Sequence, residues 1–437
     1  MGTYGEKAYA FLEQISFPRV SGSPEEYQAA EWIAEQVRTM GFQPSFEEFT
    51  VSHNRPVTAK LTLTAPETVE YTVTGCINAQ NTPPEGTEAE FYYLRNIDDI
   101  FLKSAKGKFV LLNDRPSEKE YKQLVEAGIV GFLLMNGTSR DTLENSDLDT
   151  MRFRDCYGKY GAVPAFAIRM IDALDLLHRK PERVHFTLQT EPVTVTSRNI
   201  VVEVPGSDLQ AEVIAVGAHY DSTQFSCGAW DNGAGVVGLL GLLEHLAAHP
   251  PRRTVKVIFF GSEEVGLKGS RAYLQAHPEL QDTLLSMVNV DVGGSFLGKE
   301  MVVVTGTQAA EDYVRGILYD TGHSARLSSG VMSSDSIVFS DYGIPSISLG
   351  QFPPQGGGYM HTRYDNIAMI SPEVLEEEIR FLIALVQRLA NGAVFPIPRV
   401  IPKNLRQNII DYFGTGLSHT ETVTEFPEEP EPNKPLF

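Results

Sequence analysis

The chain of 437 residues is long enough for two or three domains with a large core, which excludes a disulfide-stapled mini-protein. Hydrophobic residues make up 42% and charged residues 21% of the chain, as is typical of soluble folded proteins and not of disordered or membrane-embedded ones. A formal net charge of −20 repels both nucleic acids and anionic membranes, so we expect neither as a partner.

The N-terminal part of the chain predicts two amphipathic helices. Apolar residues recur at helical spacing over Ala8–Ile15, which gives the first helix one apolar face. Ser23 is a good N-cap for the second helix, and Glu26 three residues later would complete a capping box. Two β-rich segments, Ser45–Val51 and Lys60–Thr64, follow the helices.

A stretch with a different rhythm then covers residues 71–194. Within it, Lys108–Leu112 and Ile129–Met135 predict buried strands, and Glu118–Ala127 between them predicts a helix. We interpret this stretch as a smaller α/β domain that is inserted into a discontinuous larger one.

From Asn199 onward strands and helices alternate, which favours an α/β fold with a mixed, mainly parallel sheet sandwiched by helices. The strands are expected at Val213–Gly217, Val255–Phe260, Met287–Val290, Met301–Thr305 and Ser346–Leu349, and the helices at 232–247, after Gly266, at 309–318 and at 371–389. We expect residues 1–70 and 195–400 to form one discontinuous domain. Residues 401–437, rich in proline and glutamate, predict a C-terminal tail.

The cysteine content and the N-terminus bear on the location of the protein. Cys76, Cys156 and Cys227 are odd in number and far apart, which favours a reducing compartment over a disulfide framework. No basic segment followed by an apolar stretch begins the chain, and the longest apolar region, Val236–Leu243, is too short to span a membrane. We therefore expect a cytoplasmic protein, or a secreted one if a natural leader precedes this sequence.

Acidic residues and histidines occur at five places, several of them directly after a predicted strand. In an open α/β sheet, such strand ends are where ligands bind. The five places are His219-Tyr220-Asp221, Asp231-Asn232-Gly233, Glu263-Glu264, Asp291 and His361.

Four of the five places have a simpler interpretation when each is taken alone. His219 is then a structural histidine, Asp231 an N-cap, Glu263 and Glu264 solvated charges, and Asp291 a turn residue. Together, however, the five places supply two imidazoles and five carboxylates, a mixed nitrogen and oxygen set that suits zinc or a related divalent ion.

The order of these residues resembles peptidase family M28, the co-catalytic zinc peptidases, whose pattern is His-x-Asp, Asp, Glu-Glu, Asp and His. The sharpest match is Gly261-Ser-Glu-Glu-Val-Gly-Leu-Lys-Gly-Ser270, and Ala229–Gly235 and Asp341–Pro345 also resemble family segments. The insert is similar to a protease-associated domain through Gly107–Leu112 and Ala127–Gly131. The resemblance implies a zinc-peptidase fold of the phosphorylase/hydrolase-like type.

The resemblance also implies two zinc ions, for which cobalt or manganese can substitute. One ion would be held by His219 and Asp291 and the other by Glu264 and His361. Asp231 would bridge the two ions. Two metal ions lower the pKa of a water molecule that they share and polarise the carbonyl of the substrate.

Three further residues receive roles in catalysis from the resemblance. Asp221 would orient His219, and Glu263, which binds no metal, would be the general base and then the acid for the leaving amine. Several family members carry a tyrosine directly before the last histidine ligand, where it stabilises the oxyanion, but this position is Met360 here. Tyr359, one residue earlier, is the candidate for this role.

The function that the resemblance implies is hydrolysis of peptide bonds, and we expect an aminopeptidase that releases N-terminal residues from peptide substrates. A carboxypeptidase or dipeptidase of the same family is the nearest alternative, with Arg363 as the only arginine beside a predicted ligand. A one-metal enzyme of the glutaminyl-cyclase kind and a non-catalytic binding relative are further alternatives, and the complete ligand set argues against both. Nothing in the sequence indicates the oligomeric state.

Overall fold

The computed structural model describes residues 2–137, 141–153, 155–354, 360–414 and 416–421. It divides into a larger unit, Met1–Val51 with Val195–Phe437, and a smaller unit, Ser52–Thr194. The sequence predicts an insert from residue 71, whereas the smaller unit begins at Ser52. The reason is that the two β-rich segments expected near the N-terminus are one strand, β1 (Ser45–Ala65), which runs across this boundary.

The two N-terminal helices are confirmed as α1 (Tyr4–Ile15) and α2 (Pro24–Thr39). The Ser23 side chain caps α2 by accepting a hydrogen bond from the Glu26 N–H at 3.1 Å. The predicted capping box is wrong in its second half, because the Glu26 carboxylate accepts from the Gly22 N–H at 2.6 Å and from the Ser197 hydroxyl at 2.7 Å. Glu26 therefore joins this turn to the rest of the larger unit.

The strands of the larger unit pair in the order β13–β12–β14–β11–β9–β10–β8. Strand β9 is parallel to β10 and β11, and β11 is parallel to β14. Strand β8 runs antiparallel to β10, and β12 runs antiparallel to β14. The expected mixed, mainly parallel sheet is thus confirmed. The bounds are β8 (Arg183–Val204), β9 (Leu209–His219), β10 (Arg253–Phe260), β11 (Leu284–Val290), β12 (Lys299–Thr305), β13 (Arg326–Ser329) and β14 (Ser346–Phe352).

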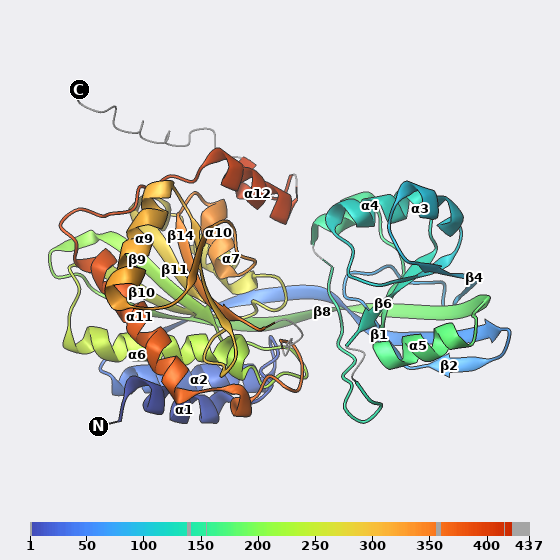
Figure 1. Cartoon of the computed structure of the whole chain (residues 1–437), viewed down its shortest axis with the longest axis horizontal. Coiled ribbons are helices and arrows are strands. Elements are labelled where there is room, and N and C mark those ends of the chain that lie inside the picture. The colour runs from blue at the N-terminus through green and yellow to red at the C-terminus, as the bar shows by residue number, and fades with distance from the viewer. Residues whose placement is uncertain (1, 138–140, 154, 355–359, 415, 422–437) are drawn as a thin grey trace. The chain divides into compact units, whose positions relative to one another are not determined.

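Both faces of this sheet are buried. In β10, Val255, Val257 and Phe259 belong to one core and Ile258 and Phe260 to another, as the alternation of side chains along a strand requires. Helices α1, α2, α6, α9 and α11 cover the first face and α7, α10 and α12 the second (Figure 1). Their bounds are α6 (Ala234–Ala248), α7 (Lys268–Ala276), α9 (Gln308–Thr321), α10 (Asp335–Asp341), α11 (Pro372–Asn391) and α12 (Lys403–Phe413), and shorter turns are η2 (Ala229–Gly233), α8 (Leu280–Thr283), η3 (Ile367–Met369) and η4 (His419–Glu421).

The C-terminal part of the chain differs from the expected tail. Residues Lys403–Phe413 form helix α12, which buries Leu405, Ile409 and Phe413 in the second core. These apolar residues recur every four positions, and the prolines just before them obscured that pattern. Beyond α12, the buried carboxylate of Asp341 accepts hydrogen bonds from the Ser418 hydroxyl at 2.5 Å and from two backbone N–H groups, those of His419 and Thr420, at 2.9 Å.

The smaller unit has a core of its own around the parallel strands β4, β5, β6 and β7. The predicted helix between two buried strands is confirmed as α4 (Glu118–Ala127), ended by Gly128 in the left-handed conformation at φ 74°. The bounds are β2 (Val69–Tyr71), β3 (Val73–Gly75), β4 (Thr87–Leu94), α3 (Asp99–Ala105), β5 (Phe109–Leu112), β6 (Gly131–Asn136), η1 (Asp155–Tyr160), β7 (Ala165–Arg169) and α5 (Met170–His178). Across the described ranges, none of the helices is both long enough and apolar enough to cross a bilayer.

Candidate metal centre

The fold brings the five predicted ligand positions to one edge of the larger unit's sheet. His219 is the last residue of β9, and Asp291 directly follows β11, the parallel neighbour of β9. Glu264 follows β10, which is the other parallel neighbour of β9. Asp231 lies in η2, just before α6, and His361 lies in the segment between β14 and η3.

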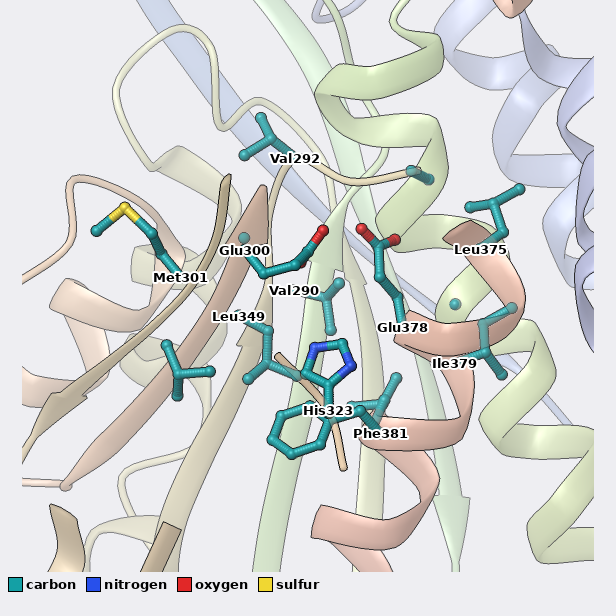
Figure 2. A pocket seen from close by; sticks show the side chains of 15 residues that line it. Val290, Val292, Glu300, Met301, His323, Leu349, Leu375, Glu378, Ile379 and Phe381 are labelled. Carbon is teal, nitrogen blue, oxygen red and sulfur yellow. The ribbon is translucent and has the colours of Figure 1, made fainter. Parts of the chain in front are cut away.

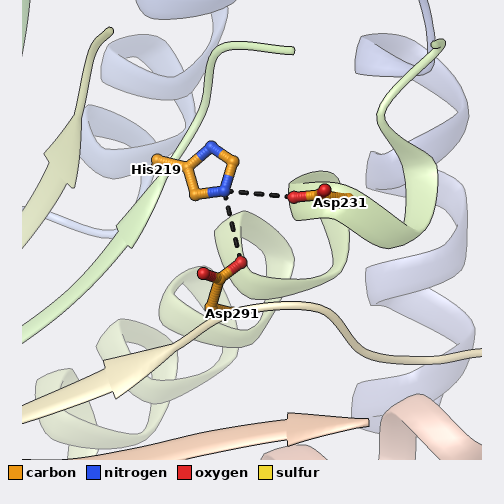
Figure 3. Close-up of side chains that lie close together, drawn as sticks. All are labelled: His219, Asp231 and Asp291. Carbon is orange, nitrogen blue, oxygen red and sulfur yellow. Dashed lines mark hydrogen bonds and ion pairs between the residues drawn. The ribbon is translucent and has the colours of Figure 1, made fainter. Parts of the chain in front are cut away.

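One group of possible ligands consists of His219, Asp231 and Asp291, all of them buried (Figure 3). The His219 Nε2 atom lies 3.2 Å from Asp231 Oδ1 and 3.2 Å from Asp291 Oδ1. One ligand atom of each residue lies within 4.8 Å of the others, a spacing that suits a single metal ion between them.

The second group consists of Asp231, Glu264 and His361, so that Asp231 is common to both. His361 Nε2 lies 3.0 Å from Glu264 Oε2 and 3.3 Å from Asp231 Oδ2. Asp231 therefore directs one carboxylate oxygen to each group. The side chain of His361 is 46% exposed, so the second group is the more open of the two to solvent.

Asp221 and Glu263 belong to neither group. The Asp221 Oδ1 atom lies 3.5 Å from His219 Nδ1, and the Asp221 carboxylate accepts the backbone N–H groups of Glu263 at 2.9 Å and Glu264 at 3.1 Å. The buried Asp221 carboxylate thus lies behind His219, a predicted ligand of the first group. It also fixes the backbone of Glu263 and of Glu264, a predicted ligand of the second group.

Three non-glycine residues at or directly beside predicted site residues have left-handed backbone conformations: Ser262 at φ 59°, Val292 at φ 62° and His361 at φ 62°. Such conformations cost about 1–3 kcal/mol each and are retained where the surroundings fix them. For the β-branched Val292 the conformation is especially unfavourable. The strain is thus concentrated at His361 itself and directly beside Glu263 and Asp291.

Asp365 supports the site, although the pattern of the sequence predicts no role for it. Its fully buried carboxylate accepts hydrogen bonds from the Trp230 N–H at 2.7 Å, the Asp231 N–H at 3.2 Å and the Ser226 hydroxyl at 2.9 Å. It therefore joins the segment that carries His361 to the segment that carries Asp231. The only signal in the sequence is its position four residues after His361.

Arg19, which no motif in the sequence indicates, holds the same segment from the N-terminal side. Its buried guanidinium donates to the carbonyl oxygens of Tyr220 at 2.7 Å, Cys227 at 2.7 Å and Gly228 at 3.0 Å, and also to those of Ile15 and Phe17. Burial lowers the pKa of this guanidinium. Since all of these acceptors are backbone atoms, no motif of side chains reveals the contact.

The electrostatics of the two groups fit a divalent cation. Burial alone would lower the pKa of His219, but Asp291, Asp221 and Asp231 raise it well above its ordinary value. Burial raises the pKa of Glu264 to about 7, and Glu264 Oε1 is buried with no hydrogen-bond partner in the described structure. A divalent ion satisfies carboxylates crowded in this way, and imidazole with carboxylate is a donor set that zinc accepts.

Two predicted residues stand apart from this geometry. Tyr359, the candidate for stabilising the oxyanion, lies outside the described residues. Its neighbour Met360 is partly buried and packs against the first core. Arg363, considered for a substrate carboxylate, is an exposed residue of the segment between His361 and Asp365.

Comparison with known proteins finds relatives of the part of the chain that carries the centre. Residues 199–386 match the model of peptidase family M28. The chain is similar to Aminopeptidase YwaD of Bacillus subtilis, with 25% identity over 430 residues that cover 93% of this chain and 89% of the relative. It is also similar to human Carboxypeptidase Q, with 23% identity over 431 residues that cover 92% of this chain and 89% of the relative.

Solved structures show the same fold. A zinc aminopeptidase from Bacillus subtilis, BSAP, superimposes with a TM-score of 0.74 and 22% identity over 92% of this chain and 98% of its own. An aminopeptidase from Aneurinibacillus sp. strain AM-1 gives a TM-score of 0.69 at 23% identity, over 90% of this chain and 95% of its own. Residues 199–386, which match the model of peptidase family M28, carry both groups of possible ligands.

Proposed function

We propose that this protein is a zinc metallopeptidase with two metal ions, and that it acts as an aminopeptidase. The observation that carries the proposal is the pair of histidine and carboxylate groups that share Asp231. His219, Asp231 and Asp291 would hold one ion, and Asp231, Glu264 and His361 the other. When bound, such ions supply Lewis acidity toward the scissile carbonyl and make water a stronger acid.

The remaining chemistry belongs to side chains of the chain itself. Glu263 lies beside the ligand Glu264 but joins neither group, so its carboxylate is free to take a proton from water and to deliver it to the leaving nitrogen. Asp221 holds the Glu263 N–H at 2.9 Å, which limits the movement of this base. Proton transfer by a positioned carboxylate contributes roughly 10²–10⁴ to the rate.

The choice of an aminopeptidase is supported by relatives whose names state that activity. YwaD and the Aneurinibacillus enzyme both match over at least nine-tenths of this chain. The substrates would accordingly be peptides with a free α-amine. The resemblance of residues 71–194 to a protease-associated domain stays a prediction, as does the role of Tyr359 in stabilising the oxyanion.

A carboxypeptidase is the second candidate, because Carboxypeptidase Q also matches over 92% of this chain. The two functions require opposite ends of the peptide at the metal centre. A carboxypeptidase would need a cation for the substrate carboxylate, and Arg363 is the arginine closest in sequence to a predicted ligand.

The test is hydrolysis of Leu-Gly-Gly and of its N-acetylated form by the zinc-loaded protein, with the products identified by mass. Release of leucine from the free peptide alone would establish an aminopeptidase that requires the α-amine. Release of C-terminal glycine from both peptides would assign a carboxypeptidase. Cleavage of neither peptide by protein that retains zinc would contradict the proposed peptidase activity on short peptides.

A further inference from the structure

The segment Asp291–Ser295, which begins with a predicted metal ligand, has all five of its backbone N–H groups hydrogen-bonded. Two of them donate to backbone carbonyls, Asp291 to Leu349 at 2.9 Å and Gly293 to Trp230 at 3.2 Å. The other three donate to side chains: Val292 to Asn232 Oδ1 at 3.2 Å, Gly294 to Glu378 Oε1 at 3.0 Å and Ser295 to Gln351 Oε1 at 2.7 Å. Side chains from three other elements therefore set the path of this segment.

Glu378 is the only carboxylate among these three side-chain acceptors, and it lies directly against the backbone of the segment. A Cβ atom at Gly293 would come within 2.7 Å of Glu378 Oε2. Gly294 has a φ of 76°, a conformation that glycine adopts without strain and that presents its N–H to α11. Gly293 thus leaves room for the carboxylate, and Gly294 directs its N–H to it.

Glu378 is paired with a second carboxyl group, that of Glu300 on β12. The two face each other in a cavity of about 30 Å³, which has room for a water molecule or two (Figure 2). Two carboxyl groups that face each other in a mostly apolar space are best accommodated when one donates a hydrogen bond to the other. Such a bond requires that one of them carries a proton. In agreement, burial raises the pKa of Glu300 to about 7, and burial and Glu300 together raise the pKa of Glu378 well above its ordinary value.

The other groups around this pair are few. Most of the residues that line the cavity are apolar, and among the lining residues that the structure describes the only other titratable one is His323. Burial lowers the pKa of His323, whose ring stacks on Phe381 with 4.4 Å between the centroids. The charge of Glu377, the preceding residue of α11, opposes ionisation of both glutamates. Nothing in this list supplies a positive charge at neutral pH.

We propose that Glu378 is a positioning residue for the metal ligand Asp291, holding its segment through Gly294 while a hydrogen bond with Glu300 fixes the Glu378 carboxyl group. The inference rests on the proposed function, because it concerns a ligand of the proposed zinc site. Groups that fix metal ligands in this way contribute 10–100-fold to metal affinity in other proteins.

The first test measures zinc affinity of metal-free protein by competition with a chelator of known affinity. Glu378→Leu is expected to weaken binding about 10–100-fold, because the Gly294 N–H and Glu300 both lose their partner. Glu378→Gln retains an acceptor for the Gly294 N–H and gains a donor for Glu300. Its zinc affinity should therefore stay within about threefold of that of the wild type. Glu377→Asp, which keeps the charge at an exposed position one residue away on α11, is the control.

The outcomes separate the two proposals. Wild-type affinity in a folded Glu378→Leu variant would overturn the positioning role and leave the proposed function intact. A wild-type protein that binds no zinc would overturn both. Catalytic activity is not needed for either conclusion.

A second measurement covers the case in which Glu378→Leu does not fold. The shared proton is bound in the folded protein at pH values where glutamates of the unfolded chain are ionised, so stability must fall as pH rises from about 4.5 through the pKa of the pair. Glu300→Gln removes the shared proton, and its urea midpoint should therefore rise relative to the wild type between pH 5 and pH 9. Parallel pH profiles of the two proteins would contradict the proton-sharing pair.

Discussion

Replacement of Asp365 tests whether the hydrogen bonds around Asp231 hold the metal centre together. Asp365→Ala would leave the buried N–H groups of Trp230 and Asp231 without their acceptor, together with the Ser226 hydroxyl. An unsatisfied buried donor costs about 1–3 kcal/mol, so the two N–H groups alone predict a loss of roughly 4 kcal/mol in the free energy of unfolding.

Asp365→Asn is the matched control for this prediction. The Ser226 hydroxyl and the Asp231 N–H both bond to Oδ2, whereas the Trp230 N–H bonds to Oδ1. If the asparagine oxygen takes the Oδ2 position, the bonds from Ser226 and from the Asp231 N–H are retained. The NH₂ group then faces the Trp230 N–H, and only that hydrogen bond is lost. The expected loss is therefore about 1–3 kcal/mol, between those of the wild type and Asp365→Ala.

The assay is urea unfolding of chelator-treated protein, followed by tryptophan fluorescence. Both tryptophans of the chain, Trp32 and Trp230, lie in the larger unit, so the signal reports on that unit and not on the smaller one. Zinc affinity is measured in parallel and should fall about 10–100-fold in Asp365→Ala. The reasoning is refuted if the free energy of unfolding of Asp365→Ala lies within about 0.5 kcal/mol of the wild-type value, the range of neutral surface substitutions, and if the variant binds zinc as tightly as the wild type.

Three other predictions follow from the centre and its supports. Glu263→Gln should retain zinc and lose roughly 10²–10⁴ in kcat on Leu-Gly-Gly, and full activity of this variant would exclude Glu263 as the base. Asp231→Asn should lower the zinc content measured by elemental analysis, since Asp231 belongs to both groups. Arg19→Met removes a charged donor from several backbone carbonyls and should destabilise the larger unit by at least about 3 kcal/mol in the fluorescence assay, and an unchanged urea midpoint would contradict this. Removal of zinc present at 100 times its dissociation constant should lower the free energy of unfolding by about 2.7 kcal/mol, and a midpoint independent of zinc would argue against binding to the folded protein.

The order of strands and helices in the larger unit could be predicted because its strands are buried on both faces. Runs such as Val255–Phe260 are apolar throughout, and the intervening helices carry clear apolar stripes. The strand β1 and the helix α12 were harder to recognise. Polar residues and Pro56 divide the pattern of β1, and the prolines before Lys403 suggested a tail where a short amphipathic helix follows.

The ligand residues could be predicted for a related reason. His219 ends an apolar strand and Asp291 directly follows one, so both must lie at the same edge of a parallel sheet. Asp231 and His361 do not directly follow a strand, and the resemblance to peptidase family M28 implied their role. The structure brings all the predicted ligands into two adjoining groups. The roles assigned to these residues in binding zinc and in catalysis stay predictions until metal binding and turnover are measured.

The supporting residues could not be predicted in this way. Asp365, Arg19 and Glu378 act on backbone N–H or carbonyl groups that are distant in sequence, and every residue type presents those groups. A pattern of side chains therefore contains no record of the contact. Only the path of the folded chain shows which backbone atoms need a partner, and that path depends on the packing of the whole unit.

The division of the larger unit into two stretches of sequence has a consequence for the order of events during synthesis. Helix α1 packs on α11 in one core, and its Gly5 N–H donates to Glu376 of α11 at 2.6 Å, although 371 positions separate the two residues. The ribosome therefore releases α1 long before its partner exists, while residues 52–194 can form their own core in between. Since His361 also follows residues 52–194 in the chain, the nascent protein cannot possess both groups of ligands until this last predicted ligand has left the ribosome.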